Sequence, residues 1–363
     1  MIVVFTGGTG GTKLVQGLQQ VVAPAELTVI VNTGDDLEWW GLHVSPDIDS
    51  VLYGLAGLLS TDRGWGVAGD SFRCLERMQQ LGQPSWFSLG DLDLATHLTR
   101  TAMLRAGKTL SEATSELAAK FGVRARVLPM SDDRVSTMLD TEKGTLTFQE
   151  YFVRARHQVI VRGVRFEGAE QARPAPGAIE SIEHAEAIVF APSNPVTSIG
   201  PILAVPGIRN ALRQTPAPVI AVSPIVEGAA VSGPAGTLMQ MMGWPSTIAG
   251  VARAYEDFLD VLVADEADRP AVSRQQSAVS DQQSAISGQP ATGSRWQLST
   301  VSSQPSAVSP EHARSDPKVR ATIREPRSTR ILYTNTIMRS MKDKRELATF
   351  ILAACLTAES AKA

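Results

Sequence analysis

The chain has 363 residues, of which 43% are hydrophobic and 20% charged, an ordinary globular composition with enough apolar material for a core. Its formal net charge of −3 argues against a general nucleic-acid-binding protein, because no overall positive field would attract a polyanion. The two cysteines, Cys74 and Cys355, have neither CxxC nor metal-ligand spacing, so neither a disulfide framework nor a zinc site is expected.

The first six residues are mostly apolar and run directly into glycines. They have no basic leader, so we interpret them as a buried first strand rather than a signal sequence. No apolar stretch approaches the roughly 20 residues that a membrane-spanning helix requires. We therefore expect a cytoplasmic protein without a membrane partner.

The first elements follow a strand–helix–strand order. Residues 2–5 are a short apolar run, residues 14–21 carry an apolar helical stripe, and residues 27–31 are a second apolar run. Continuous apolar strands that alternate with amphipathic helices are typical of a parallel sheet covered on both faces. The predicted fold is therefore α/β, with a Rossmann-like, doubly wound and mostly parallel sheet.

A mostly helical stretch follows, from Asp47 to about Gly122. Residues 94–104 and 110–121 have the period of helices packed on each other, which predicts a helical subdomain over about 50–122, inserted over the sheet. Further strands are expected at residues 126–128, 145–153, 187–191, 219–222, 258–263 and 329–333, with a final helix at 341–356.

Residues 271–318 contain three near-repeats rich in Ser, Gln, Ala and Pro. Such a stretch has too few large apolar residues to offset the entropy of ordering, so we expect a disordered insertion. The remaining residues, 1–270 plus 319–363, are expected to form one α/β domain.

The loop after the first strand reads Gly7-Gly8-Thr9-Gly10-Gly11-Thr12-Lys13. Glycines let backbone amides approach a phosphate, and the start of the following helix adds a favourable dipole. The loop matches neither the Walker A pattern nor GxGxxG, and a merely tight turn is the alternative. We expect it to bind a nucleotide or phosphate.

Four aspartates follow within fifteen residues: Asp35, Asp36, Asp47 and Asp49. The first pair lies at the carboxyl end of a strand, where open α/β sheets bind their ligands. The second pair lies in a helix start with Ser45 as N-cap, so stabilisation of the helix dipole is the alternative explanation. Carboxylates beside a phosphate loop suit Mg²⁺, which commonly bridges to phosphates.

Other candidates are weaker taken singly. Ser193 and Asn194 follow the strand at 187–191 and suit either a helix cap or a nucleotide contact. His97 is the best-placed histidine because it adjoins Asp91 and Asp93. The early tryptophans suit either a planar-ring pocket or packing of the helical subdomain.

Ordered blocks along the chain match a known family. They include GGTGGTKL (7–14), VNTGDD (31–36), GLHVSPDIDSVLYGLAG (41–57), LGDLDLATHLTRTAMLRAG (89–107), LPMSDD (128–133) and APSNPVTSIGPIL (191–203). On these blocks the chain resembles the 2-phospho-L-lactate transferase family of deazaflavin coenzyme (coenzyme F-420) biosynthesis. The resemblance runs from Met1 to about Asp268 and resumes at Tyr333, and the insertion at 271–318 is foreign to it.

The resemblance implies transfer of a phospholactyl or phosphoenolpyruvyl group from a guanosine-diphosphate-linked donor to the ribityl hydroxyl of a deazaflavin, with release of GMP. It also implies a homodimer and Mg²⁺ as the cofactor. The implied roles are as follows: Gly8, Thr9, Gly10, Lys13, Ser193 and Asn194 bind the nucleotide and its phosphates; Asp49 and Ser88 contact the deazaflavin; Asp35, Asp36 and Asp49 bind the metal; Asp35 and Asp49 are catalytic.

The chain departs from the family pattern at two positions. Ser88 stands where some relatives carry lysine, and Asn335 stands where aspartate is usual. Two alternative functions are a nucleotide-sugar-binding regulator of the related superfamily and a nucleotidyltransferase that makes the activated donor. The regulator would lack the acceptor-side blocks at 45–50 and 89–97, which this chain has.

Overall fold

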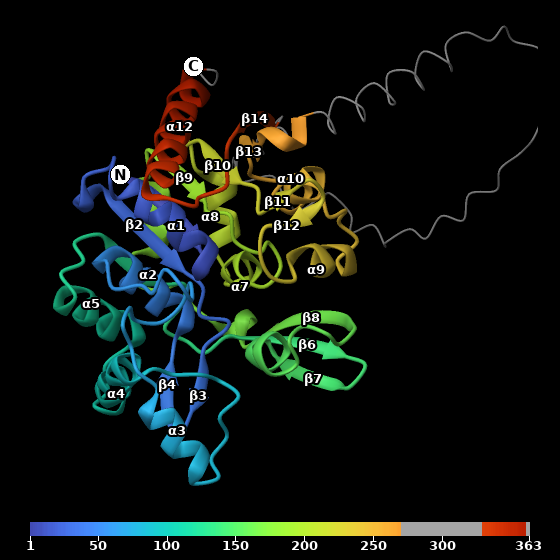
Figure 1. Cartoon of the computed structure of the whole chain (residues 1–363). Coiled ribbons are helices and arrows are strands. Elements are labelled where there is room, and N and C mark those ends of the chain that lie inside the picture. Colours follow the sequence, from blue (N-terminus) through green and yellow to red (C-terminus); the bar gives the residue numbers. More distant parts are fainter. Residues whose placement is uncertain (270–328, 361–363) are drawn as a thin grey trace, which may run out of the picture. The chain divides into compact units, whose positions relative to one another are not determined.

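A seven-stranded parallel sheet forms the centre of the protein in a computed structural model that describes residues 1–269 and 329–360 (Figure 1). Its strands, in spatial order, are β14 (Arg330–Thr334), β13 (Val261–Asp265), β10 (Val219–Val222), β9 (Ala187–Phe190), β1 (Ile2–Thr6), β2 (Leu27–Val31) and β5 (Arg126–Pro129). The described residues belong to one compact unit. The predicted insertion at 271–318 lies outside the described residues.

The central strands are buried on both faces, which explains their uninterrupted apolar sequence. In β1 all five residues are buried, and so are those of β2. Val4 points to the face covered by α1 (Thr9–Leu18), α2 (Pro46–Ala56), α5 (Leu110–Lys120) and α12 (Met341–Ser360). Phe5 points to the other face, where its ring stacks on Phe190 at 4.8 Å. The doubly wound α/β prediction is confirmed.

The connection from β2 to β5 carries the predicted helical stretch. It contains a hairpin of β3 (Leu37–Trp39) and β4 (Leu42–Val44), then α2, α3 (Arg73–Gln80), α4 (Asp91–Arg105) and α5. The hairpin was not predicted, because each of its strands has only three residues.

The buried face of α4 corrects one expectation. An apolar stripe was predicted there, but Leu92 and Leu98 are more than half exposed, whereas Asp93, His97 and Arg100 are buried. These polar side chains pair with one another and with Asp49, so their burial does not leave their charges unbalanced.

A second, antiparallel sheet corrects another expectation. Its order is β7 (Gly144–Thr147), β6 (Ser136–Thr141) and β8 (Val161–Glu167). The strand predicted over 145–153 ends at Thr147, because the Glu150 carboxylate accepts hydrogen bonds from the Thr147 backbone and hydroxyl and the chain enters a π-helix, η2 (Glu150–Arg154). Likewise, β13 starts at Val261 rather than at residue 258, since Phe258 packs among aromatic rings before the strand begins.

The remaining elements are short. They are the helices η1 (Pro24–Glu26), η3 (Ala169–Gln171), α6 (Ala178–Glu183), α7 (Ile199–Ala204), α8 (Ile208–Gln214), α9 (Ala235–Met241), α10 (Ile248–Ala254) and η4 (Glu266–Asp268), with the strand pair β11 (Ile225–Val226) and β12 (Ala229–Ala230). None of the helices in the described ranges combines the length and apolarity needed to span a bilayer.

The strand order reverses at β1. From β1 the chain moves outward to β2 and β5, then returns to the other side of β1 as β9 and continues to β10, β13 and β14. The loops after β1 and β9 therefore diverge and leave a crevice at the carboxyl edge of the sheet, which is where doubly wound proteins bind ligands. The glycine loop and the Ser193–Asn194 loop lie at this crevice.

Gly17 determines how closely α1 and α12 pack, and it yields a stability prediction. A Cβ atom at Gly17 would collide with the backbone carbonyl of Lys344 in α12. Gly17→Ala should therefore lower the free energy of unfolding by about 1–3 kcal/mol, although alanine is favoured over glycine within an isolated helix. Urea denaturation measures this loss, with the exposed helical substitution Ser115→Ala as control. An unchanged Gly17→Ala midpoint would show that α12 can shift without loss of packing.

Candidate functional site

The glycine loop and the loop after β9 are joined directly. Gly8 is the N-cap residue of α1, and the Gly7 amide donates to the Ser193 hydroxyl at 3.1 Å. A side chain at Gly11 would collide with Thr6 and Ser193, so only glycine allows this approach. The structure thus brings the predicted residues Gly8 and Ser193 to one place.

The first turn of α2 reaches the glycine loop from the other side. A Cβ atom at Gly8 would collide with the Asp47 carboxylate. The Asn32 side-chain amide donates to that carboxylate at 2.9 Å, and its oxygen accepts from the Gly34 amide at 2.8 Å. Asn32 is fully buried and holds the end of β2 against α2. Asn32 was not identified from sequence, whereas Asp47 was identified as a member of the acidic cluster.

Asp35 and Asp47 are close enough to repel each other. Burial raises the pKa of Asp35 well above its usual range, and the charges of Asp47 and Asp36 raise it further. Burial likewise raises the pKa of Asp47 to about 7. Neither carboxylate forms an ion pair with a lysine or arginine in the described part of the chain, and Asp35 Oδ1 is buried without a hydrogen-bond partner. This uncompensated negative charge suits a bound cation.

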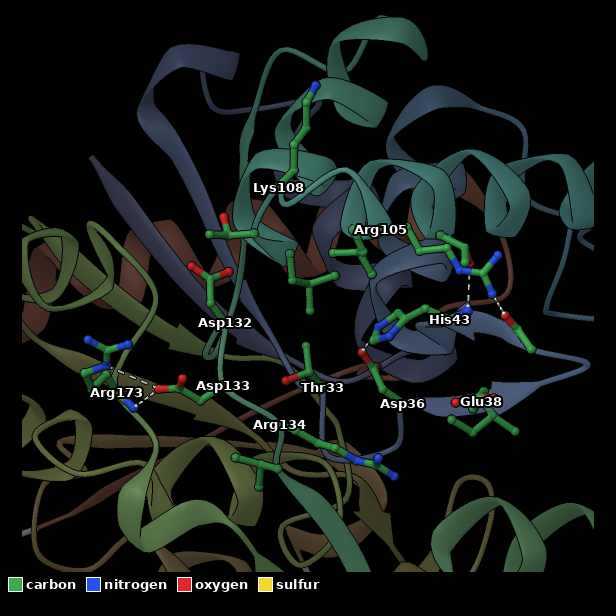
Figure 2. Close-up of a pocket in the computed structure, with 17 residues that line it drawn as sticks. Thr33, Asp36, Glu38, His43, Arg105, Lys108, Asp132, Asp133, Arg134 and Arg173 are labelled. Atoms are coloured by element: carbon green, nitrogen blue, oxygen red, sulfur yellow. Dashed lines mark hydrogen bonds and ion pairs between the residues drawn. The ribbon is translucent and has the colours of Figure 1, made fainter.

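Asp36 faces a different cavity, which has a volume of about 660 Å³ (Figure 2). Its carboxylate accepts from the Ser45 hydroxyl at 2.7 Å and lies 3.0 Å from His43 Nε2. Ser45 precedes α2 as predicted, but its hydroxyl bonds to Asp36 rather than capping the helix. Arg173 pairs with Asp133 and His43 with Asp36 at this cavity, and we assign it no ligand.

Asp49 lines a cavity of about 270 Å³, which we call the Asp49 cavity. Thr9 of the glycine loop and Asp35 line it as well, so it opens onto both predicted phosphate-side elements. Ser88, which the family resemblance assigns to the deazaflavin, forms part of its wall. Its aromatic and remaining polar lining includes Tyr53, Trp65, Phe87, Asp93, His97, Phe148, Gln149 and Phe152.

The tryptophans divide between the two roles proposed for them. Trp39 is buried and packs against Trp40 and Trp86, with centroid distances of 5.7 and 4.8 Å. Trp65 instead lines the Asp49 cavity and remains 38% exposed. Packing therefore explains the first three, whereas Trp65 is available to a planar ligand.

Residues of α4 hold Asp49. From sequence, His97 was identified among them but Arg100 was not. Arg100 forms a two-pronged ion pair with Asp49, and His97 Nδ1 lies 3.5 Å from the same carboxylate. Asp93, also on α4, accepts from the Tyr53 hydroxyl at 2.7 Å. The signal in the sequence was the spacing of residues 93, 97 and 100, which places three ionisable side chains on one face of a helix.

Two predicted nucleotide-binding residues have neighbours outside the glycine loop. Lys13 is half-buried on α1 and close to Lys344 of α12, where its charge adds to the effect of burial in lowering the Lys344 pKa. The Asn194 side chain accepts from the Val196 amide at 2.9 Å and so closes its own turn. The nucleotide-binding roles of Lys13 and Asn194 stay predictions, as does that of Gly10.

The chain matches the protein family described as 2-phospho-L-lactate transferase CofD over residues 2–301. It is 45% identical over 268 residues to a 2-phospho-L-lactate transferase from Methanosarcina mazei, covering 74% of this chain and 88% of that protein. It is 47% identical over 282 residues to a phosphoenolpyruvate transferase from Streptomyces griseus, covering 76% and 89%. A crystal structure of a UPF0052 family member from Bacillus halodurans overlaps 73% of this chain and 79% of that one, with 21% identity and a TM-score of 0.49.

The raised pKa of Asp47 yields a prediction about stability and pH. Between about pH 4 and pH 7 the folded chain binds this proton more tightly than the unfolded chain does, so its contribution to stability falls as pH rises. Asp47→Asn removes that penalty. We compare the free energy of unfolding of Asp47→Asn with that of the unsubstituted chain, without divalent cations. This difference should shift in favour of the variant by on the order of 2 kcal/mol when the pH is raised from 5 to 8. Urea denaturation at both pH values, with the exposed Asp62→Asn as control, checks this; equal pH trends would contradict it.

Proposed function

Because the chain belongs to the 2-phospho-L-lactate transferase CofD family and is a transferase, we propose that it makes a deazaflavin phosphodiester in coenzyme F-420 biosynthesis. A phospholactyl or phosphoenolpyruvyl group would pass from a guanosine-diphosphate-linked donor to the ribityl hydroxyl of the deazaflavin, and GMP would leave. The observation that carries this proposal is that one cavity holds Asp49 and Ser88 and opens onto Thr9 and Asp35.

The walls of the Asp49 cavity suit a planar acceptor. Phe148 and Phe152 stack on each other at 5.5 Å with an interplanar angle of 7°. Trp65 and Phe152 are each 38% exposed, so their ring surfaces are not used up by packing in the core. Aromatic rings give a flat heterocycle a large apolar contact area at low entropic cost. The ribityl chain of the acceptor would then extend toward Asp49 and Asp35.

The glycine loop supports the donor side. The ten-residue helix α1 begins directly after Gly8, so its free amides and its dipole favour a diphosphate there. The Ser193 hydroxyl lies beside the same loop. Gly8, Thr9, Gly10, Lys13, Ser193 and Asn194 are the residues that we assign to the nucleotide and its phosphates.

Mg²⁺ fits the acids of this site. Asp35 and Asp47 lack a cationic partner among the described residues, and one oxygen of Asp35 is buried without a hydrogen bond. We assign the cation to Asp35 and Asp47 rather than to the predicted ligands Asp36 and Asp49, because Asp36 accepts a hydrogen bond from Ser45 and Asp49 is paired with Arg100. A bound Mg²⁺ neutralises charge on the diphosphate and on the transferring phosphorus.

The transfer follows from this placement. The acceptor hydroxyl oxygen attacks the distal phosphorus of the donor, and the bond from that phosphorus to the bridging oxygen breaks, so that GMP leaves with the electron pair. The hydroxyl proton passes to a carboxylate, and Asp35 is a candidate because it lines the same cavity as Asp49. Asp49 would orient the hydroxyl, and no covalent enzyme intermediate is required.

Two alternative functions differ in what they bind. A nucleotide-sugar-binding regulator would bind the nucleotide but no deazaflavin, and a nucleotidyltransferase would release pyrophosphate from GTP. The acceptor cavity beside the glycine loop favours the transferase over both. The cytoplasmic location and the homodimer stay predictions, although the exposed Leu92 and Leu98 on α4 suit a subunit contact.

Mass spectrometry tests the reaction itself. The purified chain is incubated with Mg²⁺, the deazaflavin and either the lactyl- or the enolpyruvyl-diphosphoguanosine. We expect a mass gain of one phospho-acid group and release of GMP. Asp49→Asn, which keeps an oxygen to accept from Arg100, should lower turnover by at least about a hundredfold, and its Tm is measured alongside. Glu116→Gln on exposed α5 surface is the control. Absence of product with both donors, together with no deazaflavin binding, would refute the proposal.

A thermal-shift titration tests the cation site without using activity. Mg²⁺ should raise the Tm at pH 8 and raise it less at pH 6, because protonation of Asp47 below about pH 7 competes with the metal. Asp47→Asn should abolish most of the shift, and Asp62→Asn should keep it. An equal shift in Asp47→Asn and Asp62→Asn would remove Asp47 from the cation site.

A further inference from the structure

The buried acids of the site form two groups that differ in charge balance. Asp35 and Asp47 have no cationic partner among the described residues. Asp49 is paired with Arg100, and Asp93 lies beside His97. A carboxylate that is already neutralised attracts a metal cation less than one that is not. The two groups are therefore suited to different tasks.

Arg100 holds Asp49 in a single orientation. Its side chain is fully buried, and Nη1 donates to Asp49 Oδ2 at 3.1 Å while Nη2 contacts Oδ1. A planar guanidinium that bonds both oxygens of a carboxylate restricts its rotation as well as balancing its charge. Water does not compete for this partner, because the Arg100 side chain is fully buried.

His97 extends the pair into a network. Its Nδ1 lies 3.5 Å from Asp49 and its Nε2 lies 3.3 Å from Asp93, whose carboxylate also accepts from the Tyr53 hydroxyl. Asp49, Tyr53, Asp93 and His97 all line the Asp49 cavity. Arg100 stands behind them, on the same face of α4 as His97. The network is therefore a wall of the proposed acceptor site.

Three side chains of this network lie close enough together to hold a metal ion: Asp49, Asp93 and His97. A metal site is therefore the alternative to a network held together by Arg100. An ion there would sit against the Arg100 guanidinium, which is bonded to both oxygens of Asp49. Like charges in a buried place repel strongly, so displacement of Arg100 would have to precede metal binding. The geometry favours the network without a metal.

We propose that Arg100 and His97 are positioning residues that aim the Asp49 carboxylate at the acceptor hydroxyl and confine the catalytic cation to Asp35 and Asp47. This inference rests on the proposed function, since it assigns Asp49 to the deazaflavin side. Arg100 touches neither substrate; it acts only through Asp49. His97 lies beside Oδ2 of the same carboxylate, the oxygen that also accepts from Arg100 Nη1, and on its other side it lies beside Asp93.

The experiment separates acceptor binding from cation binding. Deazaflavin affinity is measured by titration of its fluorescence, and Mg²⁺ binding by thermal shift, for Arg100→Lys, His97→Gln and Asp49→Asn. Arg100→Lys keeps the positive charge but cannot bond both oxygens of Asp49, so deazaflavin affinity and kcat should each fall at least tenfold. The Mg²⁺ concentration that gives half of the thermal shift should stay within twofold of that for the unsubstituted chain. His97→Gln should act in the same direction, and Asp49→Asn should retain the Mg²⁺ shift. The exposed Arg124→Met is the control.

A loss of folding is checked separately. Arg100→Met leaves the Asp49 charge buried and unpaired, whereas Arg100→Met with Asp49→Asn does not, so the double variant should recover the Tm that the single variant loses.

Unchanged deazaflavin affinity in Arg100→Lys, or loss of the Mg²⁺ shift in Asp49→Asn, would overturn the inference while leaving the transferase function in place. Failure of the unsubstituted chain to bind deazaflavin would overturn both.

Discussion

The contact between the Asp47 carboxylate and the backbone of Gly8 is the constraint on which the rest of the site depends. It exists because three loops from different strands meet at the point where the strand order reverses. Asn32 ties Asp47 to the end of β2, and Ser193 ties the loop after β9 to Gly7. A side chain at Gly8 or Gly11 would separate these loops, so the glycines serve close approach of backbone and carboxylate.

The meeting of these loops buries the carboxylates of Asp35 and Asp47 at a place where their negative charge does not stabilise the fold. Burial disfavours the ionised forms of Asp35 and Asp47, and their mutual repulsion adds to the cost. A protein selected for stability alone would not keep both carboxylates there. Their retention is explained when a cation and a diphosphate occupy the crevice, because the acids then become ligands and the amides at the start of α1 meet the phosphates.

Around the Asp49 cavity, by contrast, the buried carboxylates have partners within the protein. Asp49 and Asp93 are as deeply buried as Asp35, but Arg100, His97 and Tyr53 accompany them. Asp49 accepts hydrogen bonds from Arg100 and Asp93 accepts one from Tyr53, which favours one fixed geometry over an exchangeable ligand. Transfer of a phosphoryl-type group requires both properties, since its rate depends on charge neutralisation and on the alignment of the attacking oxygen.

Much of the architecture followed from the sequence, because it rests on local patterns. Apolar runs ending in polar loops gave correct positions for β1, β2, β9 and β10, and the doubly wound arrangement followed from their alternation with helices. Residue type and spacing alone predicted that the glycine loop and the early acids form one cluster, and the structure places Asp47 against Gly8. The π-helix η2 was missed, since a side-chain bond from Glu150, rather than periodicity, ends the preceding strand.

What the sequence could not determine was which charge pairs with which. Asp47 and Asp49 are two residues apart on one helix, yet Asp47 turns to the glycine loop and Asp49 to Arg100, fifty-one residues further along the chain. Leucines on α4 suggested an apolar inner face, but the helix turns Asp93, His97 and Arg100 inward. The choice of face depends on the partners supplied by neighbouring elements, and only tertiary packing brings those partners within bonding distance. Residue type and spacing therefore determined the chemistry available at the sheet edge, and the fold decided how it was divided.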